Sequence, residues 1–506
     1  MAGRVQRQAL PPAVGRVPSR FRSARVGAAR RDRAPLRAQA GRRAVDADVE
    51  RRRRVPPHRA SAAVSERDAS RRVEGERGLA RVIGRWGLAA GIVNVTVGGG
   101  IFRLPSGVAA EVGAAAPLAY LACTLAMGLI VLCFADAGSR VSMTGGPYAY
   151  VETAFGPFVG FVSGVLLWVG ITLAVSAVSS FFADSIVALV PALGSTGRAI
   201  AISAVLVALA AANVRGARGV TRFNTAATLA KLVPLVLLVL VGLATMKWSN
   251  LAWTTPPNGG AVARASVLLV FAFLGVESAL VPSGEVDDPA RTVPRAIFIA
   301  MTVVALLYVA IQLVAQGLLG AALPGDPTPL ASAANVALGP AGRTLILIGS
   351  TVSMFAYVSG MTLAVPRMLF AFGRDGFLPS ALARVHPRWH TPYVAIVAQT
   401  AIVLLLALFA RFEQLAVAAN VTVLIVYGAC CLAAAELRRR DVRSGGIPFR
   451  VPAGAVIPWL ALAVITWILW GLRADEWRAA ALVVAAAVVV YLATARTRRA
   501  RAVSAA

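Results

Sequence analysis

The chain has 506 residues, of which 58% are hydrophobic, and a mean hydropathy of +0.71. Soluble domains are about 45–50% apolar, so this composition argues against an ordinary soluble enzyme or binding domain. The formal net charge is +28, from 51 Lys and Arg against 23 Asp and Glu. A nucleic-acid-binding protein interleaves basic residues with a soluble core, whereas here they fall in a tail and in short loops. The sequence therefore predicts an integral membrane protein.

The first ~80 residues differ from the rest, because they are rich in Arg, Ala, Pro and Ser and contain the block Arg51–Arg54. Such a segment buries too little apolar area to offset its chain entropy and is expected to be disordered. It has no apolar stretch of the kind that a secretory signal needs. Three interpretations stay open: a cytoplasmic basic tail attracted to anionic lipid, a nucleic-acid-binding arm, or a translation start near Val64 or Val73. The first and third are favoured, and no nucleic-acid partner is expected.

From Trp86 onward the chain is a series of apolar runs of the length that crosses a bilayer, about 18–25 residues. Each must be helical, because lipid offers no partner to backbone polar groups. The fold class is therefore all-α integral membrane, with about twelve spans. They are expected near 87–110, 116–136, 157–190, 197–213, 224–245, 265–284, 295–320, 342–372, 393–410, 415–436, 455–472 and 479–494.

Arginines concentrate after the even-numbered spans, and cytoplasmic loops are the ones enriched in Lys and Arg. The loops concerned hold Arg215, Arg218, Arg222, Arg291, Arg295, Arg374, Arg384, Arg388, Arg438, Arg439 and Arg440. Both ends of the chain are basic as well. We therefore expect both termini in the cytoplasm of a bacterium, with the spans in its inner membrane.

Two spans carry interruptions at corresponding places, the first span of each five-span half. The first contains Gly98-Gly99-Gly100-Ile101-Phe102, and the sixth contains Phe271-Ala-Phe273-Leu-Gly275-Val-Glu277. A glycine in a helix interior costs about 1 kcal/mol relative to alanine. One interpretation is close helix packing through small residues. The other is a pair of broken helices that form a transporter's binding site near the membrane midplane.

The ionisable residues inside the spans are the next candidates for function. Lys231 lies well inside the fifth span, and an ionisable group at that depth is costly and points to function; the alternative is snorkelling to the cytoplasmic surface. Glu277, in the interrupted part of the sixth span, would bind an amine, carry a proton, or only hydrogen-bond unwound backbone. Glu285 lies nearer the cytoplasmic end and is expected to anchor a loop or gate. Phe271 and Phe273 are candidates for a lid over the substrate, or for packing.

Other chemistries find no support in the sequence. The two lysines, Lys231 and Lys247, follow Ala230 and Met246, so the Gly-Lys-[Ser/Thr] of a nucleotide-binding loop is absent. Four cysteines in apolar stretches and three histidines outside them suggest neither a disulfide framework nor a metal site. No hydrolase motif is present. We expect no cofactor, no metal and no enzymatic activity.

Several motifs together resemble the amino acid–polyamine–organocation permeases over roughly residues 85–440. Gly98-Gly99-Gly100-Ile101-Phe102-Arg-Leu-Pro105 resembles the G-S-G-I-F-x-x-P signature of that superfamily. The other matching stretches are Gly145-Gly146-Pro147-Tyr148-Ala149-Tyr150 with Phe155-Gly156-Pro157, Phe273 to Glu277 with Glu285 to Pro289 and Pro294-Arg295, Pro366 to Pro379, and His386-Pro with Thr391-Pro392.

The resemblance implies a LeuT-type fold of two inverted five-helix repeats in 85–440. Two accessory helices in 441–496 and a basic cytoplasmic tail at 497–506 would follow. It implies that N–H groups around Gly98 to Ile101 hold the substrate's carboxylate, and that carbonyls near Phe271 to Gly275 hold its ammonium. Lys231 falls where several members carry a lysine in place of sodium.

The sixth-span motif is similar to that of the arginine–agmatine antiporter branch, where the glutamate matching Glu277 is tied to pH response and an aromatic matching Phe271 gates. Gly99 replaces the usual serine, and Gly284 stands where many members have a second acidic residue. These changes leave the substrate preference undetermined. Phe273 is an alternative to Phe271 as the gate.

These residues predict a sodium-independent amino acid permease that works by alternating access, through proton symport or exchange. The alternatives are a polyamine or amine exchanger and a transporter-like receptor without net flux. Its expected partners are an amino acid or amine, protons and the bilayer.

Overall fold

A computed structural model describes residues 84–141, 146–215, 220–253, 256–279, 286–443, 447–449, 451 and 453–495. The expectations for the tail at 1–80, for Glu285 and for the tail at 497–506 lie outside these residues. The described part of the chain forms helices joined by short connections, with no strand in it.

The first half contains α3 (Arg85–Thr96), α4 (Gly100–Val112), α5 (Ala116–Arg140), α6 (Pro147–Phe155), α7 (Pro157–Leu189), α8 (Gly194–Arg215) and α9 (Val220–Thr245). The second half contains α10 (Gly259–Phe273), α11 (Val276–Ala279), α12 (Pro289–Leu319), α13 (Pro329–Ala364), α14 (Pro366–Arg374), α15 (Tyr393–Phe409) and α16 (Phe412–Arg439). Two further helices follow, α17 (Ile457–Trp470) and α18 (Ala474–Ala493). Short 3₁₀ turns connect several of them, at Gly113–Ala115, Pro191–Leu193, Trp248–Leu251, Gly320–Ala322 and Ser380–Ala383.

Each of the twelve expected spans overlaps a helix of the structure. In the described ranges, seven helices are long and apolar enough to cross a membrane. The shorter apolar helices are Lys231–Thr245, Gly259–Phe273, Tyr393–Phe409 and Ile457–Trp470. The predicted all-helical, multi-pass membrane fold is therefore confirmed.

The eighth expected span, 342–372, begins close to the second of the two helical pieces within α13 (Pro329–Ala364). Gly339, with φ +70° and non-helical backbone, separates a first piece that begins at Pro329 from the longer piece that follows. The first piece was not predicted. Glycine is permissive at positive φ, and proline is tolerated at the first turn of a helix. The Gly-Pro pair therefore joins two helical pieces. The short helix α6 was also missed.

The helix contacts repeat between the two halves. α7 packs against α16 as α13 packs against α9, and α3 packs against α12 as α10 packs against α5. The same exchange relates the pair α16 and α5 to the pair α9 and α12. In each case a contact of the first half has its counterpart with the roles of the two halves exchanged. This is the arrangement of an inverted repeat.

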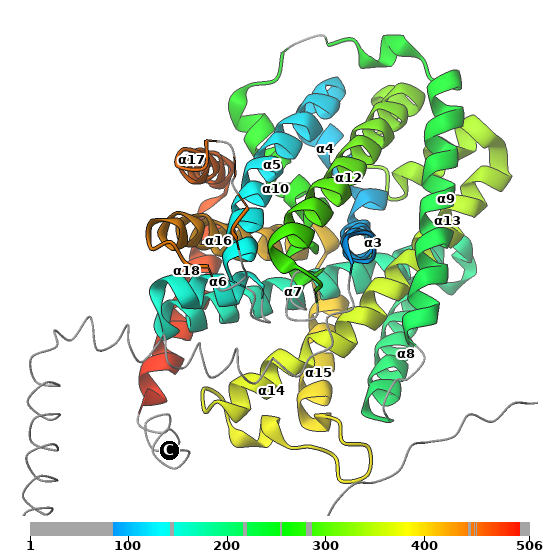
Figure 1. Ribbon diagram of the computed structural model, residues 1–506. Helices are drawn as coiled ribbons and strands as arrows, with labels where there is room; N and C mark the ends of the chain where they lie inside the picture. The colour runs from blue at the N-terminus through cyan, green and yellow to red at the C-terminus, as the bar shows by residue number, and fades with distance from the viewer. Residues whose placement is uncertain are drawn as a thin grey trace, which may run out of the picture. The chain divides into compact units, whose positions relative to one another are not determined.

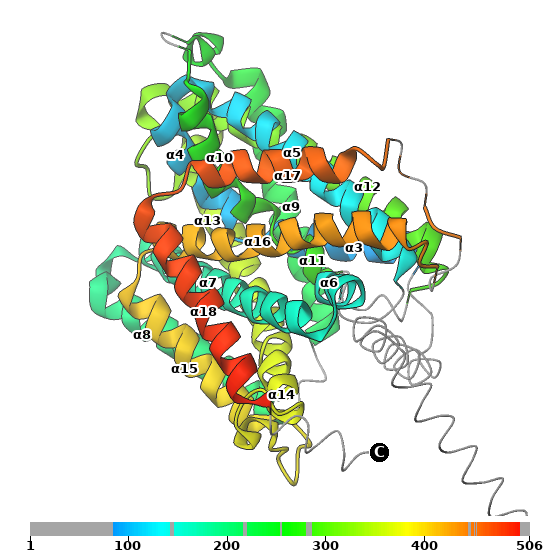
Figure 2. The ribbon, with the colours of Figure 1, turned by 90° about the vertical axis from the view of Figure 1, so that its left-hand side faces the viewer.

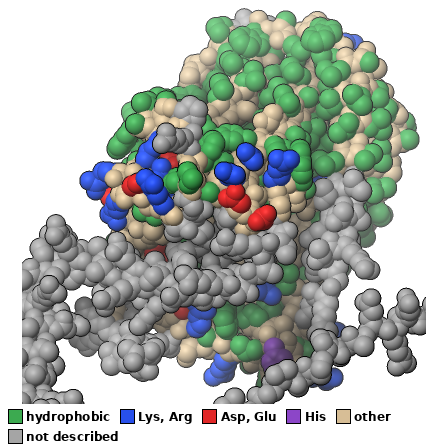
Figure 3. Space-filling model, viewed as in Figure 1, with side chains coloured by type: hydrophobic (Ala, Val, Ile, Leu, Met, Phe, Trp, Pro, Cys, Tyr) green, Lys and Arg blue, Asp and Glu red, His purple; other side chains and the backbone are tan. Residues whose placement is uncertain are grey.

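The two interrupted helices lie inside the bundle. Figure 1 shows α3 end-on near the centre, with α12, α7 and α13 around it. α17 lies alongside α16, and α18 lies against α16 and α7 (Figure 2). In the view of Figure 3, blue and red side chains gather in a band at the left and centre, and apolar side chains cover much of the surface above. This polarity pattern fits helices that face lipid along their length and water at their ends.

Candidate functional site

The first interruption separates α3 from α4 in the core of the bundle. α3 ends at Thr96 and α4 begins at Gly100. The Gly98 amide donates to the Thr96 carbonyl at 2.8 Å. The first N–H groups of a helix have no intrahelical partner, and the helix dipole makes that end attractive to an anion. The expected interruption of the first span is confirmed, with residues 97–99 between the two helices. Carboxylate binding at the α4 N-terminus stays a prediction.

The same glycines also allow close packing. A Cβ on Gly99 would lie 3.0 Å from Met354 Cγ and 3.2 Å from Val178 Cγ1, and one on Gly100 would lie 2.9 Å from Phe271 Cδ1. Packing through small residues and helix breakage are therefore both present at this place, although the sequence suggested them as alternatives.

The second interruption separates α10 from α11 and touches the first. α10 ends at Phe273, α11 begins at Val276, and Gly275 between them has φ +117°. A Cβ on Gly275 would lie 2.7 Å from Val95 Cγ1 and 3.1 Å from the Val95 carbonyl carbon. Glycine is needed here for both its conformation and its small size. The two breaks thus meet through Gly275 and the last turn of α3.

One tyrosine on α12 connects the ends of both interrupted helices. The Tyr308 hydroxyl lies 2.9 Å from the Thr96 carbonyl oxygen and 2.9 Å from that of Ala272. Both carbonyls belong to the last turn of a helix, where carbonyls have no intrahelical donor.

Glu277 is turned into the second break. Both of its carboxylate oxygens accept from the Gly275 N–H, at 2.9 and 3.1 Å, and the Tyr427 hydroxyl donates to Oε2 at 2.6 Å. The side chain is 2% exposed. The interpretation as a hydrogen-bonding partner of unwound backbone fits this geometry, and a role in binding or proton transfer stays a prediction.

Lys231 points toward the first break. Its residue is 2% exposed, and Nζ donates to the carbonyl of Asn94 in the last turn of α3. The snorkelling interpretation does not fit, because the amine binds a core carbonyl and does not extend to a surface. The lysine places its amine where the negative end of a helix dipole lies.

The two candidate lid residues have different surroundings. Phe271 packs edge-on against Phe412 of α16, with ring centroids 5.4 Å apart, and lies against Gly100. Phe273 packs against Tyr308 at 5.4 Å and is fully buried. Phe271 is therefore the phenylalanine that adjoins the α4 N-terminus.

Sequence reasoning missed Tyr308 and Tyr427. A tyrosine in an apolar helix needs a hydrogen-bond partner for its hydroxyl when it is buried. That requirement marks both as candidates, but it does not say which distant group each one contacts.

A family model described as amino acid permease matches residues 83–497. This chain belongs to the amino acid permease family. Relatives include the methylthioribose transporter of Bacillus subtilis, 27% identical over 433 residues, which covers 82% of this chain and 93% of that protein. The branched-chain amino acid permease BcaP of the same organism is 26% identical, covering 77% of this chain and 87% of that protein. The serine/threonine exchanger SteT, also of Bacillus subtilis, is 29% identical, covering 77% and 90%.

These similarities make the permease a multi-pass membrane transporter and not an enzyme. The motif resemblance to the amino acid–polyamine–organocation superfamily is confirmed. The finer likeness to its arginine–agmatine branch stays a prediction.

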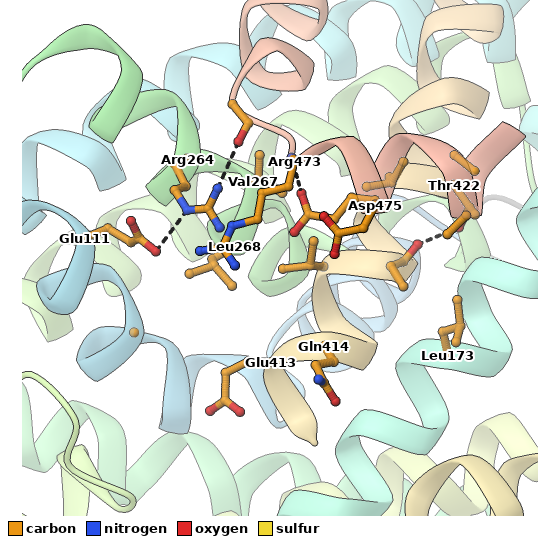
Figure 4. A pocket seen from close by; sticks show the side chains of 18 of the residues that line it. Glu111, Leu173, Arg264, Val267, Leu268, Glu413, Gln414, Thr422, Arg473 and Asp475 are labelled. Carbon is orange, nitrogen blue, oxygen red and sulfur yellow. Dashed lines mark hydrogen bonds and ion pairs between the residues drawn. The ribbon is translucent and has the colours of Figure 1, made fainter. Parts of the chain in front are cut away.

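The permease also has a cavity of about 590 Å³ between α4, α10, α16 and α18 (Figure 4). Arg264 points toward Glu111, with Nε–Oε1 at 3.2 Å, and Nη1 donates to the Gly471 carbonyl at 3.2 Å. Arg473 and Asp475 also line the cavity. The residues that line this cavity include none of the predicted site residues.

A second ion pair links the N-terminal half of α4 to the start of α16. Arg103 Nη2 lies 2.9 Å from Glu413 Oε1 at the start of α16, and Nη1 donates to the Pro327 carbonyl at 2.5 Å. This pair joins α4 to α16 on the same side as the Phe271–Phe412 contact.

Proposed function

We propose that this permease carries an amino acid across a bacterial inner membrane without sodium, by proton symport or by exchange. One observation carries the proposal: the two helix breaks meet in the core through Gly275 and Val95. An N-terminus that attracts an anion and a helix end that offers carbonyls thereby lie together. An amino acid zwitterion has a carboxylate for the N-terminus and an ammonium group for the carbonyls.

The carboxylate of the substrate binds the N–H groups at Gly98 to Ile101. Gly99 supplies no hydroxyl, so backbone donors alone hold the carboxylate. The ammonium group binds carbonyls near Phe271 to Gly275. These contacts recognise what all amino acids share and leave the side chain of the substrate unspecified.

Lys231 supplies the cation that makes sodium unnecessary. Its ammonium group already occupies a carbonyl at the end of α3, which is the kind of ligand that sodium would use. Gain and loss of a proton at Lys231 would change that contact and so couple the position of α3 to protons. Glu277 is the second coupling candidate, because its carboxylate joins the second break to Tyr427 of α16.

Phe271 covers the bound substrate. It lies against Gly100 and Phe412, so movement of its ring would open a path from the α4 N-terminus toward α16. Phe273 packs against Tyr308 and serves as core.

A polyamine or amine exchanger is the second candidate, because carbonyls and Glu277 would suit an amine without a carboxylate.

Both termini lie in the cytoplasm, as the arginine-rich loops favour. α17 and α18 are accessory to the transporter core.

The test is competition binding to the purified full-length protein. A panel of labelled amino acids is screened first. The best one is then competed with its decarboxylated amine and with the hydroxy acid that lacks its amino group. Hydrogen bonds to charged groups contribute about 1.5–3 kcal/mol, so each analogue should compete roughly tenfold or more weakly.

Gly99→Leu should abolish binding of the amino acid, since its side chain would overlap Met354 and Val178 and displace the α4 N-terminus. Gly128→Leu is the matched control, because nothing lies within 4 Å of a Cβ on Gly128. An amine that competes as well as the amino acid would refute the carboxylate role and favour the exchanger. Normal binding by Gly99→Leu would refute the placement of the site.

A further inference from the structure

Tyr308 has a bonding pattern that the proposed function does not use. The residue is fully buried on α12, a continuous helix that packs against α3 and α9. Its hydroxyl lies 2.9 Å from the carbonyl oxygens of both Thr96 and Ala272. The ring is held edge-on against Phe273, so the hydroxyl has a fixed position between the two helix ends.

A phenol has a single hydrogen to donate, so Tyr308 cannot bond fully to both carbonyls at once. The Thr96 carbonyl also accepts the Gly98 N–H at 2.8 Å. The Ala272 carbonyl lies in the stretch Phe271 to Gly275, where the substrate's ammonium is expected. The negative end of a helix dipole favours a cation over a neutral hydroxyl at that carbonyl.

We propose that the Tyr308 hydroxyl occupies the Ala272 carbonyl in the empty permease and yields it to the substrate's ammonium group. This inference rests on the proposed function. When the ammonium arrives, the phenol loses its bond to Ala272 and keeps only the bond to Thr96, so binding at the end of α10 changes the contact that holds the end of α3. Tyr308 is thus a positioning residue that couples the two interrupted helices through α12.

The matched pair of variants is Tyr308→Phe and Tyr120→Phe. Tyr120 is also fully buried, on α5, and its hydroxyl has no hydrogen-bond partner in the described part of the chain. Tyr308→Phe removes the competitor of the ammonium, so substrate should bind about two- to tenfold more tightly, the range of one neutral hydrogen bond. Turnover in exchange should fall by a similar factor, because substrate leaves more slowly and α3 is no longer tied to α12. Tyr120→Phe should change neither quantity.

A purely structural role for Tyr308 predicts the opposite change in affinity. Weaker or unchanged binding by Tyr308→Phe, in protein that unfolds at the temperature of the wild type, would overturn the proposal. Replacement of Tyr308 by 3-fluorotyrosine gives the complementary test, because a more acidic phenol is a stronger donor and should weaken substrate binding. It also decides the matter if Tyr308→Phe fails to fold, and tighter binding by the fluorinated protein would overturn the proposal. A wild type that binds no amino acid or amine would instead refute the proposed function.

Discussion

Lys231 has the most unusual position of any charged residue among the candidates. Its amine binds the Asn94 carbonyl of α3 from the middle of α9. A charge at that depth is costly unless it is paired, and its partner belongs to the helix whose end forms the substrate site. Any change in the protonation of Lys231 therefore acts on α3 directly.

We predict that Lys231→Ala abolishes the response of transport to a proton gradient and leaves the fold intact. Loss of a charge-assisted hydrogen bond of about 1.5–3 kcal/mol should reduce gradient-driven uptake roughly tenfold or more, as measured in liposomes at two external pH values. Lys247→Ala is the control, since Lys247 is the only other lysine and is exposed. Unchanged pH dependence in Lys231→Ala would remove Lys231 from the coupling mechanism.

At the residue scale, the candidates that could be chosen from the sequence are residues that are unusual in an apolar membrane helix. A lysine in an apolar span and three successive glycines in a helix are anomalies that can be read without a structure. Tyr308 and Tyr427 are not anomalous in composition, and their partners are far away along the chain. Only the fold brings their hydroxyls to Ala272 and Glu277.

At the scale of elements, the contact between the two interruptions is what the site depends on. Gly275 makes that contact possible, because it has φ +117° and leaves room for Val95. A change there should affect both helices together.

Gly275→Ala should lower the stability of the protein by at least about 1–3 kcal/mol, the cost of a non-glycine residue in such a conformation. Overlap with Val95 adds to this cost and should weaken substrate binding. Thermal unfolding and equilibrium binding of the purified protein measure the two effects. Gly91→Ala on α3 is the matched control and should be neutral or slightly stabilising, because nothing lies within 4 Å of its Cβ. If Gly275→Ala bound substrate normally and unfolded at the wild-type temperature, the junction of the two breaks would not form the site.

Hydropathy located these elements well, but it could not place their ends where proline and glycine act inside a helix. Gly98 and Gly99 lie between α3 and α4, and Gly339 separates the two helical pieces of α13. A Cβ on Gly99 would lie against Met354, whereas nothing lies within 4 Å of a Cβ on Gly339. The first interruption is therefore packed in the core and the second is not. Local composition does not distinguish the two cases.

At the scale of the whole molecule, the sequence predicted the all-helical, multi-pass membrane fold and the interruptions in two of its helices. Span length follows from bilayer thickness, and the repeated interruptions follow from the symmetry of the fold. The identity of the substrate could not be predicted in the same way. The groups that we assign to recognition are backbone N–H and carbonyl groups, which every amino acid can bind alike.

The most direct test of the central claim is uptake by the full-length protein in sodium-free liposomes. The amino acid selected by binding is offered to empty vesicles with and without an inward proton gradient, and to vesicles preloaded with the same amino acid. We predict uptake in the absence of sodium, either concentrative and driven by the gradient or dependent on the internal amino acid. No uptake under any of these conditions, from folded protein that binds the amino acid, would contradict transport and favour a receptor.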